Sequence, residues 1–249
     1  MEHSLSLVIP CFNEWKNIEI LTQKIEELLE KSELIWKFEL IFVSDWPAKE
    51  FADLLKEVEK KYFFVKVILF PSNRWYGFSV VEGLKAAKWE YIGRTHADLQ
   101  TDPKDVFRAF EIIKEQWYPK NIYVKWVRKN RPFTDQIFSF GMGIFESVYL
   151  GTKLYEINAQ PNIFHKSFFE KRTNPPQDFA LDLYALYIAR KLKLKLVRFN
   201  VLFPKRIHGQ SNWNTWLKAK RKFIKRTIKF SRSLKKSLYD KKWDANIHS

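Results

Sequence analysis

The stretch "YGFSVVEGLKAAKWEYIGRTHADLQTDP" (residues 76–103) decides the fold, because its hydrophobic pattern changes from that of a helix to that of a strand. Apolar residues recur at helical spacing over 77–89, and "YIGRT" (91–95) is a short apolar run typical of a buried strand. Asp102 and Pro103 then mark a new helix, since Asp is a preferred N-cap and Pro is favoured at the first helical position. A helix, a buried strand and another helix in succession indicate βαβ units.

The same alternation extends to both sides of this stretch. The other expected strands are 5–10, 36–44, 63–70, 121–127, a short one near 161–164, and 194–203. The other expected helices are 14–31, 48–61, 133–150 and 178–191. We therefore predict an α/β fold, with an open, mostly parallel, Rossmann-like sheet flanked by helices. Residues 1–212 are predicted to form this domain, and residues 213–249 a separate C-terminal segment.

Composition excludes several classes of protein. A hydrophobic content of 46% in 249 residues excludes a disordered chain, and the single cysteine, Cys11, excludes an internal disulfide and suits a reducing compartment. The longest apolar stretch, 137–151, is short and is interrupted by Glu146, so no transmembrane helix is expected. The N-terminus lacks the basic region and cleavage site of a signal peptide. We expect a cytoplasmic protein.

The positive charge is concentrated near the C-terminus. The chain carries a net charge of +16, and residues 217–242 contribute +11 of it through 12 Lys or Arg and one acid. Apolar residues recur there at helical spacing: Trp213, Leu217, Ile224, Ile228, Leu234 and Leu238. One interpretation is a solvated helix that packs its apolar stripe on the body. The other, which explains the charge, is a basic amphipathic helix that holds the protein on the inner face of the cell membrane through anionic lipids.

Three potential metal ligands follow the strand at 91–95. On an extended strand, His96, Asp98 and Gln100 alternate with apolar residues and therefore face the same way. A carboxylate with an imidazole and an amide oxygen suits Mn²⁺ or Mg²⁺ and leaves positions open for phosphate oxygens. Singly, His96 is equally well explained as a buried histidine and Asp98 as a turn residue. The position after a parallel strand, where ligands bind in such sheets, favours a site.

Five stretches together resemble family 2 glycosyltransferases, in particular the dolichyl- and polyprenyl-phosphate sugar transferases. They are "LSLVIPCFNE", "FELIFVSD", the stretch 76–103, "VRKNR" and "PKRIHGQSNW", and they extend over about residues 5–213. The resemblance implies a GT-A fold, a nucleotide-diphosphate sugar as donor (UDP or GDP), a divalent metal, and transfer with inversion to a lipid-linked or glycan acceptor.

The resemblance also implies roles for individual residues. Residues implied to contact the nucleotide sugar are Pro10, Asn13, Glu14, Asp45, Gly77, Asp98, Arg206 and Ser211. Residues implied to lie near the transferred and acceptor phosphates are Arg128, Arg131 and, in "NAQPN" (158–162), Gln160. Asp98 corresponds to the second carboxylate of the family's D-x-D element, with Gln100 after it.

The chain departs from the family pattern at three places. His96 replaces the first Asp of D-x-D, which weakens a site for a hard cation and favours Mn²⁺. Ser44 replaces the first of two Asp residues, and Trp46-Pro47 replaces the turn that follows them. These changes put the nucleotide base in doubt. We interpret them as the mark of a subgroup, because the other donor-site motifs are present.

The acceptor is the open question. An acceptor phosphate is already anionic, whereas a sugar hydroxyl requires a general base. Asp178, with Asp182 one turn later as the reserve candidate, lies where the family's hydroxyl-glycosylating members carry their base, although Gln177 replaces the usual Glu. Asp178 is explained equally well as an N-cap.

Two alternative functions remain. A basic, aromatic-rich chain could bind nucleic acid, but no such motif is present and the aromatics recur with the core pattern, so no nucleic-acid partner is expected. The other alternative is an inactive relative that serves as a scaffold, which the His96 substitution leaves open.

Overall fold

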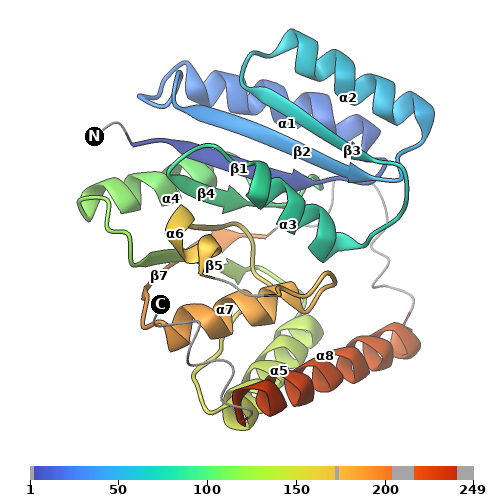
Figure 1. Ribbon diagram of the computed structural model, residues 1–249, viewed down its shortest axis with the longest axis vertical. Helices are drawn as coiled ribbons and strands as arrows, with labels where there is room; N and C mark the ends of the chain where they lie inside the picture. The colour runs from blue at the N-terminus through green and yellow to red at the C-terminus, as the bar shows by residue number, and fades with distance from the viewer. Residues whose placement is uncertain (1–2, 172–173, 204–215, 240–249) are drawn as a thin grey trace.

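The computed structural model describes residues 3–171, 174–203 and 216–239 of the chain. A seven-stranded sheet forms the centre of this described part (Figure 1). The strands are β1 (Leu5–Pro10), β2 (Phe38–Asp45), β3 (Val65–Phe70), β4 (Tyr91–Arg94), β5 (Ile122–Lys129), β6 (Asn162–His165) and β7 (Lys195–Leu202). Their order is β3-β2-β1-β4-β6-β5-β7. All pairings are parallel except those of β6, which is antiparallel to both β4 and β5.

Helices cover both faces of the sheet. They are α1 (Trp15–Leu29), α2 (Lys49–Lys61), α3 (Tyr76–Ala86), α4 (Lys104–Glu115), α5 (Phe133–Leu150), α6 (Lys166–Glu170), α7 (Leu181–Lys191) and α8 (Trp216–Tyr239). The apolar faces of α1, α2 and α4 form one core with Leu5, Leu7 and Ile9. On the other face, α3, α6 and α7 form a second core with Val8. This division follows from the alternation of side chains along β1, all of which are buried up to Ile9.

Helices α5 and α8 lie against each other at one end of the molecule, opposite α1 and α2 (Figure 1). The hydroxyl of Ser231 on α8 donates a hydrogen bond to Glu146 on α5 over 2.6 Å. Among the described residues, no helix is both long enough and apolar enough to span a bilayer.

The predicted fold class is confirmed, with differences in detail. The short strand near 161–164 is antiparallel, and helix α6 was not predicted. Helix α4 begins one residue later than predicted, so Pro103 is its N-cap and Asp102 instead accepts a hydrogen bond from the Lys104 N–H at 3.0 Å. The expected boundary between residues 212 and 213 lies outside the described residues and stays a prediction.

Candidate functional site

The carboxyl ends of β1, β2 and β4 bring the predicted donor residues to one edge of the sheet. These strands are parallel neighbours, so the segments that follow them emerge side by side. Pro10 ends β1 and Asp45 ends β2. Residues 95–101 follow β4, and the Thr95 N–H donates to the Val8 carbonyl across the gap to β1. The edge is therefore continuous from β2 to β4.

Side-chain oxygens that accept backbone N–H groups hold the segments after β1, β2 and β3 in place. Asn13 has a left-handed backbone (φ 56°), and its side-chain oxygen accepts a hydrogen bond from the Ala48 N–H at 3.3 Å. Glu14 is the N-cap of α1, and its carboxylate accepts the Phe12 N–H. Asp45 is buried, and its carboxylate accepts the Arg74 N–H at 2.7 Å, which ties β2 to the loop after β3. These three residues shape the edge as well as lining it.

Large aromatic side chains are exposed on the same edge. Trp46 follows β2 with a left-handed backbone (φ 58°) and is 61% exposed. Trp75 precedes α3, also with a positive φ, and the guanidinium of Arg226 on α8 lies over its ring at 5.5 Å. Exposed indole faces at a sheet edge suit stacking with a planar base. Trp46, which departs from the family pattern, is thus placed where a base contact is useful.

The predicted metal ligands do not lie on a strand, which corrects the sequence-based geometry. Strand β4 ends at Arg94, and residues 96–100 form a bent loop in which Leu99 has a positive φ of 53°. Strand alternation therefore does not align His96, Asp98 and Gln100. A local hydrogen bond shapes the loop instead: the Asp98 carboxylate accepts the Gln100 N–H at 3.2 Å. His96 and Asp98 remain close enough to interact: burial lowers the pKa of His96, and the Asp98 carboxylate partly opposes this lowering.

The residues after β4 fit a metal that is shared with a diphosphate. Burial lowers the pKa of His96 despite the nearby Asp98 carboxylate, so its imidazole is neutral near pH 7 and retains a lone pair for a cation. Over the described ranges, no group of three or more His, Cys, Asp or Glu side chains could hold a metal. The described residues thus supply at most two such ligands to a site here, and Mg²⁺ and Mn²⁺ often complete their shells with phosphate oxygens and water.

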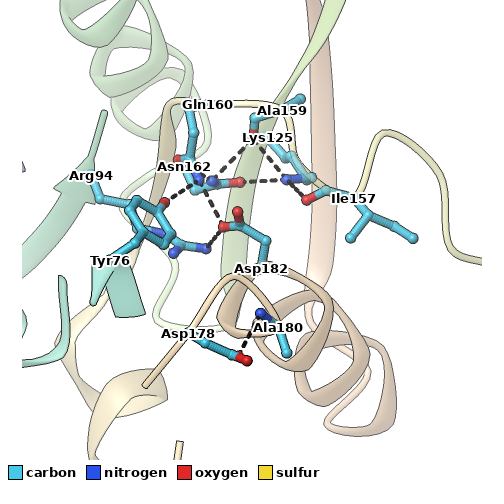
Figure 2. A network of polar contacts seen from close by, with 10 residues as sticks. All are labelled: Tyr76, Arg94, Lys125, Ile157, Ala159, Gln160, Asn162, Asp178, Ala180 and Asp182. Carbon is cyan, nitrogen blue, oxygen red and sulfur yellow. Dashed lines mark hydrogen bonds and ion pairs between the residues drawn. The ribbon is translucent and has the colours of Figure 1, made fainter. Parts of the chain in front are cut away.

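A buried ion pair lies directly behind this loop (Figure 2). Arg94, the last residue of β4, is 2% exposed and places Nη2 2.6 Å from Oδ1 of Asp182 on α7. Burial alone disfavours the charged guanidinium, but the Asp182 carboxylate outweighs it and holds the pKa of Arg94 above its ordinary value. Gln160 donates to the same carboxylate oxygen at 2.8 Å. The pair therefore joins the centre of the sheet to α7.

Asn162 connects this pair to a second buried cation. It is in register with Arg94 on β4 and with Lys125 on β5, so all three side chains lie on one face of the sheet. The ammonium of Lys125 donates to Asn162 and to the carbonyls of Ile157 and Ala159, each within 2.9 Å. Burial lowers the pKa of Lys125. Its three acceptors fix the loop that carries Gln160 (Figure 2).

These contacts revise two of the predicted roles. Gln160, expected near the acceptor, is 2% exposed. Its amide N–H groups donate to Asp182 and to the Tyr76 hydroxyl, and its amide oxygen accepts a hydrogen bond from Asn162. Asp182, the reserve candidate for a general base, is 5% exposed and is paired with Arg94. Both residues therefore support the candidate site through buried contacts, because their side chains are almost completely covered.

Asp178 lies before α7, not at its start. The helix begins at Leu181 with Ala180 as N-cap, so the prediction of a helix from residue 178 was wrong by three residues. The Asp178 carboxylate instead accepts the Ala180 N–H at 2.9 Å and closes a local turn. Gly77 at the start of α3 packs against this turn, since a Cβ there would lie 2.4 Å from the Gln177 carbonyl carbon. Its contact is thus with the protein backbone.

Arg128 and Arg131 converge on one buried carboxylate that the sequence analysis did not single out. Glu156 accepts from Nε of Arg128 at 2.8 Å and lies 3.7 Å from Nη1 of Arg131. Burial, and then the neighbouring Arg128, lowers the pKa of Arg131. Each guanidinium has five N–H donors in a fixed plane, so one shared carboxylate orients both without using all their donors. The arrangement offers paired, pre-oriented cations to an anion.

The remaining predicted residues, Arg206 and Ser211, lie outside the described residues. The residues that were missed, Arg94, Lys125 and Glu156, are buried and charged. For two of them a signal was available, because "YIGRT" and "NIYVKWV" each place a cation inside an apolar strand. A buried charge requires a partner, so such a residue indicates a polar network.

Sequence comparison places this chain among sugar transferases. The model of the family described as Glycosyl transferase family 2 matches residues 6–173. The chain is 28% identical over 115 residues to dolichol-phosphate mannosyltransferase of Saccharomyces cerevisiae, covering 46% of this chain and 43% of that protein. It is 30% identical over 131 residues to undecaprenyl-phosphate 4-deoxy-4-formamido-L-arabinose transferase of Pseudomonas syringae, covering 51% and 36%. The chain thus spans less than half the length of these relatives.

The fold is also found in solved structures. Glucosyl-3-phosphoglycerate synthase from Mycobacterium tuberculosis, in complex with Mn²⁺, UDP and glucosyl-3-phosphoglycerate, superposes with a TM-score of 0.64 over 89% of this chain and 77% of that one, at 14% identity. The same enzyme in complex with Mg²⁺ and UDP gives a TM-score of 0.66 at 15% identity, over 89% and 77%. At this identity the likeness establishes the GT-A fold.

Proposed function

Because the chain belongs to glycosyl transferase family 2, we propose that it transfers a sugar, with inversion, from a nucleotide-diphosphate sugar to a polyprenyl phosphate at a membrane. The observation that carries the proposal is the set of polar residues at the carboxyl edge of β1, β2 and β4, with the paired arginines after β5. The relatives named after dolichol phosphate and undecaprenyl phosphate support a lipid phosphate as acceptor.

The donor is proposed to lie along the edge from β1 to β4. Asp45, with Asn13 and Glu14, lines the side where the nucleoside binds, and Trp46 offers its exposed face to the base. UDP and GDP both have planar bases, so stacking alone does not select one of them. Arg206 and Ser211 are proposed to close over the diphosphate, as the family resemblance implies.

The departing diphosphate gains negative charge as the glycosidic bond breaks, and the loop after β4 is proposed to hold the group that balances it. His96 and Asp98, with the Gln100 side chain, would ligate Mn²⁺ or Mg²⁺ together with phosphate oxygens. When bound, such a cation offsets the charge that develops on the leaving group. The Arg94–Asp182 pair keeps the strand end behind this loop in place.

The acceptor phosphate is proposed to bind Arg128 and Arg131. Glu156 holds both guanidinium groups, so their free N–H donors are oriented before the acceptor arrives. A phosphate oxygen attacks the anomeric carbon as an anion and needs no base. Of the two carboxylates weighed as bases, Asp182 is engaged with Arg94, and Asp178 closes the turn before α7. This arrangement favours a phosphate acceptor.

A glycan hydroxyl is the second candidate acceptor, and the half-buried Asp178 favours it. In that case Asp178 would remove the hydroxyl proton from a position behind the anomeric carbon.

The proposed lipid-linked acceptor also indicates where in the cell the protein works. Nucleotide sugars are found in the cytoplasm, so we propose that the protein works on the inner face of the cell membrane as a peripheral protein.

Replacement of Asp178 by Asn separates the two acceptors. Asn keeps an oxygen that can accept the Ala180 N–H, so the fold is retained while the base is removed. With polyprenyl phosphate as acceptor, we expect kcat to change by less than about threefold, because no proton is removed from a phosphate anion. The measurement is transfer of labelled sugar from UDP- and GDP-hexoses to polyprenyl phosphate in detergent and, in parallel, to a glycan.

A fall in kcat of about 10²–10⁴ in Asp178→Asn would instead support a hydroxyl acceptor. If neither acceptor receives sugar from any donor, while the same preparation binds a donor, the proposed acceptor class is wrong. If no donor is bound or hydrolysed at all, the proposed function as a whole is wrong.

A further inference from the structure

Helix α5 carries an exposed apolar stripe that nothing in the transferase site uses. Phe133, Ile137, Phe140, Ile144 and Val148 recur every three or four residues and therefore share one face of the helix. Their exposed fractions are between 50% and 79%. The opposite face packs inward through Gly143, Glu146 and Leu150. A stripe of this length is larger than the scattered apolar residues of an ordinary surface and indicates a partner.

Helix α8 covers the body next to α5 with its own inner face. Thr227, Ser231 and Leu234 are buried at helical spacing, and Phe230 packs against Tyr184 of α7 with 6.5 Å between ring centroids. The inner face of α8 is therefore occupied by α5 and α7 and is not available to another partner. Leu234 of the predicted apolar stripe is thus packed on the body, as the first of the two interpretations of this segment expects, and membrane binding by the segment stays a prediction.

The outer face of α8 is cationic. Five exposed residues that recur on it every three or four positions carry positive charge: Arg221, Lys225, Lys229, Arg232 and Lys236. They lie opposite the buried positions of α8, so they point away from the body. No carboxylate occurs anywhere in α8 to neutralise them. A dense row of like charges is stabilised by an anionic partner.

The apolar helix and the cationic helix meet at a cavity of about 320 Å³. Val148 at the end of the stripe and Lys235 on α8 both line it, together with Lys191 on α7. The Lys235 ammonium lies 4.5 Å from the centre of the Tyr149 ring. Apolar side chains and ammonium groups are thus adjacent, which is the arrangement needed where lipid tails adjoin anionic headgroups.

We propose that α5 and α8 together form the surface on which this protein docks to an anionic lipid bilayer. The stripe of α5 enters the headgroup region, and the outer row of α8, with Lys191 and Lys235, binds lipid phosphates. The charge of the row favours a bilayer over a second copy of this chain, since two such rows repel each other. Only the role of this surface rests on the proposed function: docking would bring the acceptor lipid to the transferase site.

The test is flotation with vesicles in the absence of any sugar donor, so its outcome is independent of catalysis. The variant Phe140→Gln/Ile144→Gln removes apolar area from exposed positions of a helix. The matched control, Trp36→Gln/Trp117→Gln, removes exposed aromatics of 73% and 92% exposure in the loops that lead into β2 and β5. The vesicles contain either phosphatidylcholine alone or phosphatidylcholine with phosphatidylglycerol. Binding to each kind is measured at low and at high salt. Thermal unfolding is measured for both variants to verify that they fold.

We expect the unaltered protein to bind vesicles that contain phosphatidylglycerol and to be released by salt. Phe140→Gln/Ile144→Gln should weaken this partition at least about tenfold, whereas the control should bind as the unaltered protein does. Equal binding by the α5 variant and the unaltered protein overturns the proposal, as does no binding to anionic vesicles at low salt. A dimer in sedimentation that the α5 variant converts to a monomer overturns it too, because the stripe is then a subunit interface.

Discussion

Asp98→Ala is expected to reduce the rate of sugar transfer by at least about 10³-fold while leaving the fold intact. Asp98 lies in the loop after β4, where its carboxylate is proposed to bind the cation that the donor diphosphate shares. A loss of about 10³ corresponds to about 4 kcal/mol of transition-state stabilisation, which is within what one electrostatic group supplies. The side chain contributes little to the stability of the fold, since Asp98 is half-buried in a loop, where its carboxylate accepts the Gln100 N–H at 3.2 Å.

A matched control and a restoring change accompany this variant. Asp102→Ala, four residues later, also removes a carboxylate that accepts a backbone N–H, but from an exposed position at the start of α4. We expect its transfer rate to be nearly unchanged. His96→Asp should retain activity, because it introduces the carboxylate that the family carries there. Full activity in Asp98→Ala together with loss in His96→Asp would contradict the metal site. Inactivity of every form, including the unaltered protein, would favour the scaffold alternative.

Arg94→Met is expected to lower the free energy of unfolding by about 3–5 kcal/mol. The substitution leaves the Asp182 carboxylate buried, 5% exposed, with the Gln160 amide but without the cation that lies 2.6 Å away. The cost is large because the charge of Asp182 cannot reach water. Urea-induced unfolding, followed by circular dichroism, measures the change.

Two further variants identify the cause of this loss. Arg94→Met/Asp182→Leu removes both charges, and we expect it to be more stable than Arg94→Met alone, since replacing a whole buried pair by apolar groups is often neutral. Lys114→Met breaks an ion pair of similar length, 2.9 Å to Glu33, on the surface, and it should change stability little. A small effect of Arg94→Met, similar to that of Lys114→Met, would show that the pair does not support the core.

The fold was predictable because its signals are local. Buried parallel strands appear as continuous apolar runs, such as "LSLVIP" and "FELIFVS", and the helices between them have regular apolar spacing. The antiparallel direction of β6 was not predictable in this way. It depends on which strands it joins, and Asn162 pairs with residues from β4 and β5 that are far away in sequence.

The sheet edge that carries the candidate site was predictable from the sequence, but the geometry of its residues was not. The order of polar residues after successive strands placed Asp45 and Asp98 at one edge, since parallel strands end together. Which residues face the ligand depends on tertiary contacts instead. Gln160 is turned inward by Asp182, and Glu156 reaches both Arg128 and Arg131 from a loop more than twenty residues later. No local spacing in the sequence encodes such pairings.

The most direct measurement of the central claim is a calorimetric titration of the protein with UDP-hexoses and GDP-hexoses, with Mn²⁺ and with a chelator. If the edge of β1, β2 and β4 is a nucleotide-sugar site, one donor class binds in the presence of Mn²⁺. Its affinity then falls at least about tenfold with the chelator and in Asp98→Ala, because the cation shared with the diphosphate is lost. Absence of binding by every donor at millimolar concentration, with Mn²⁺ present and the protein folded, would contradict the account.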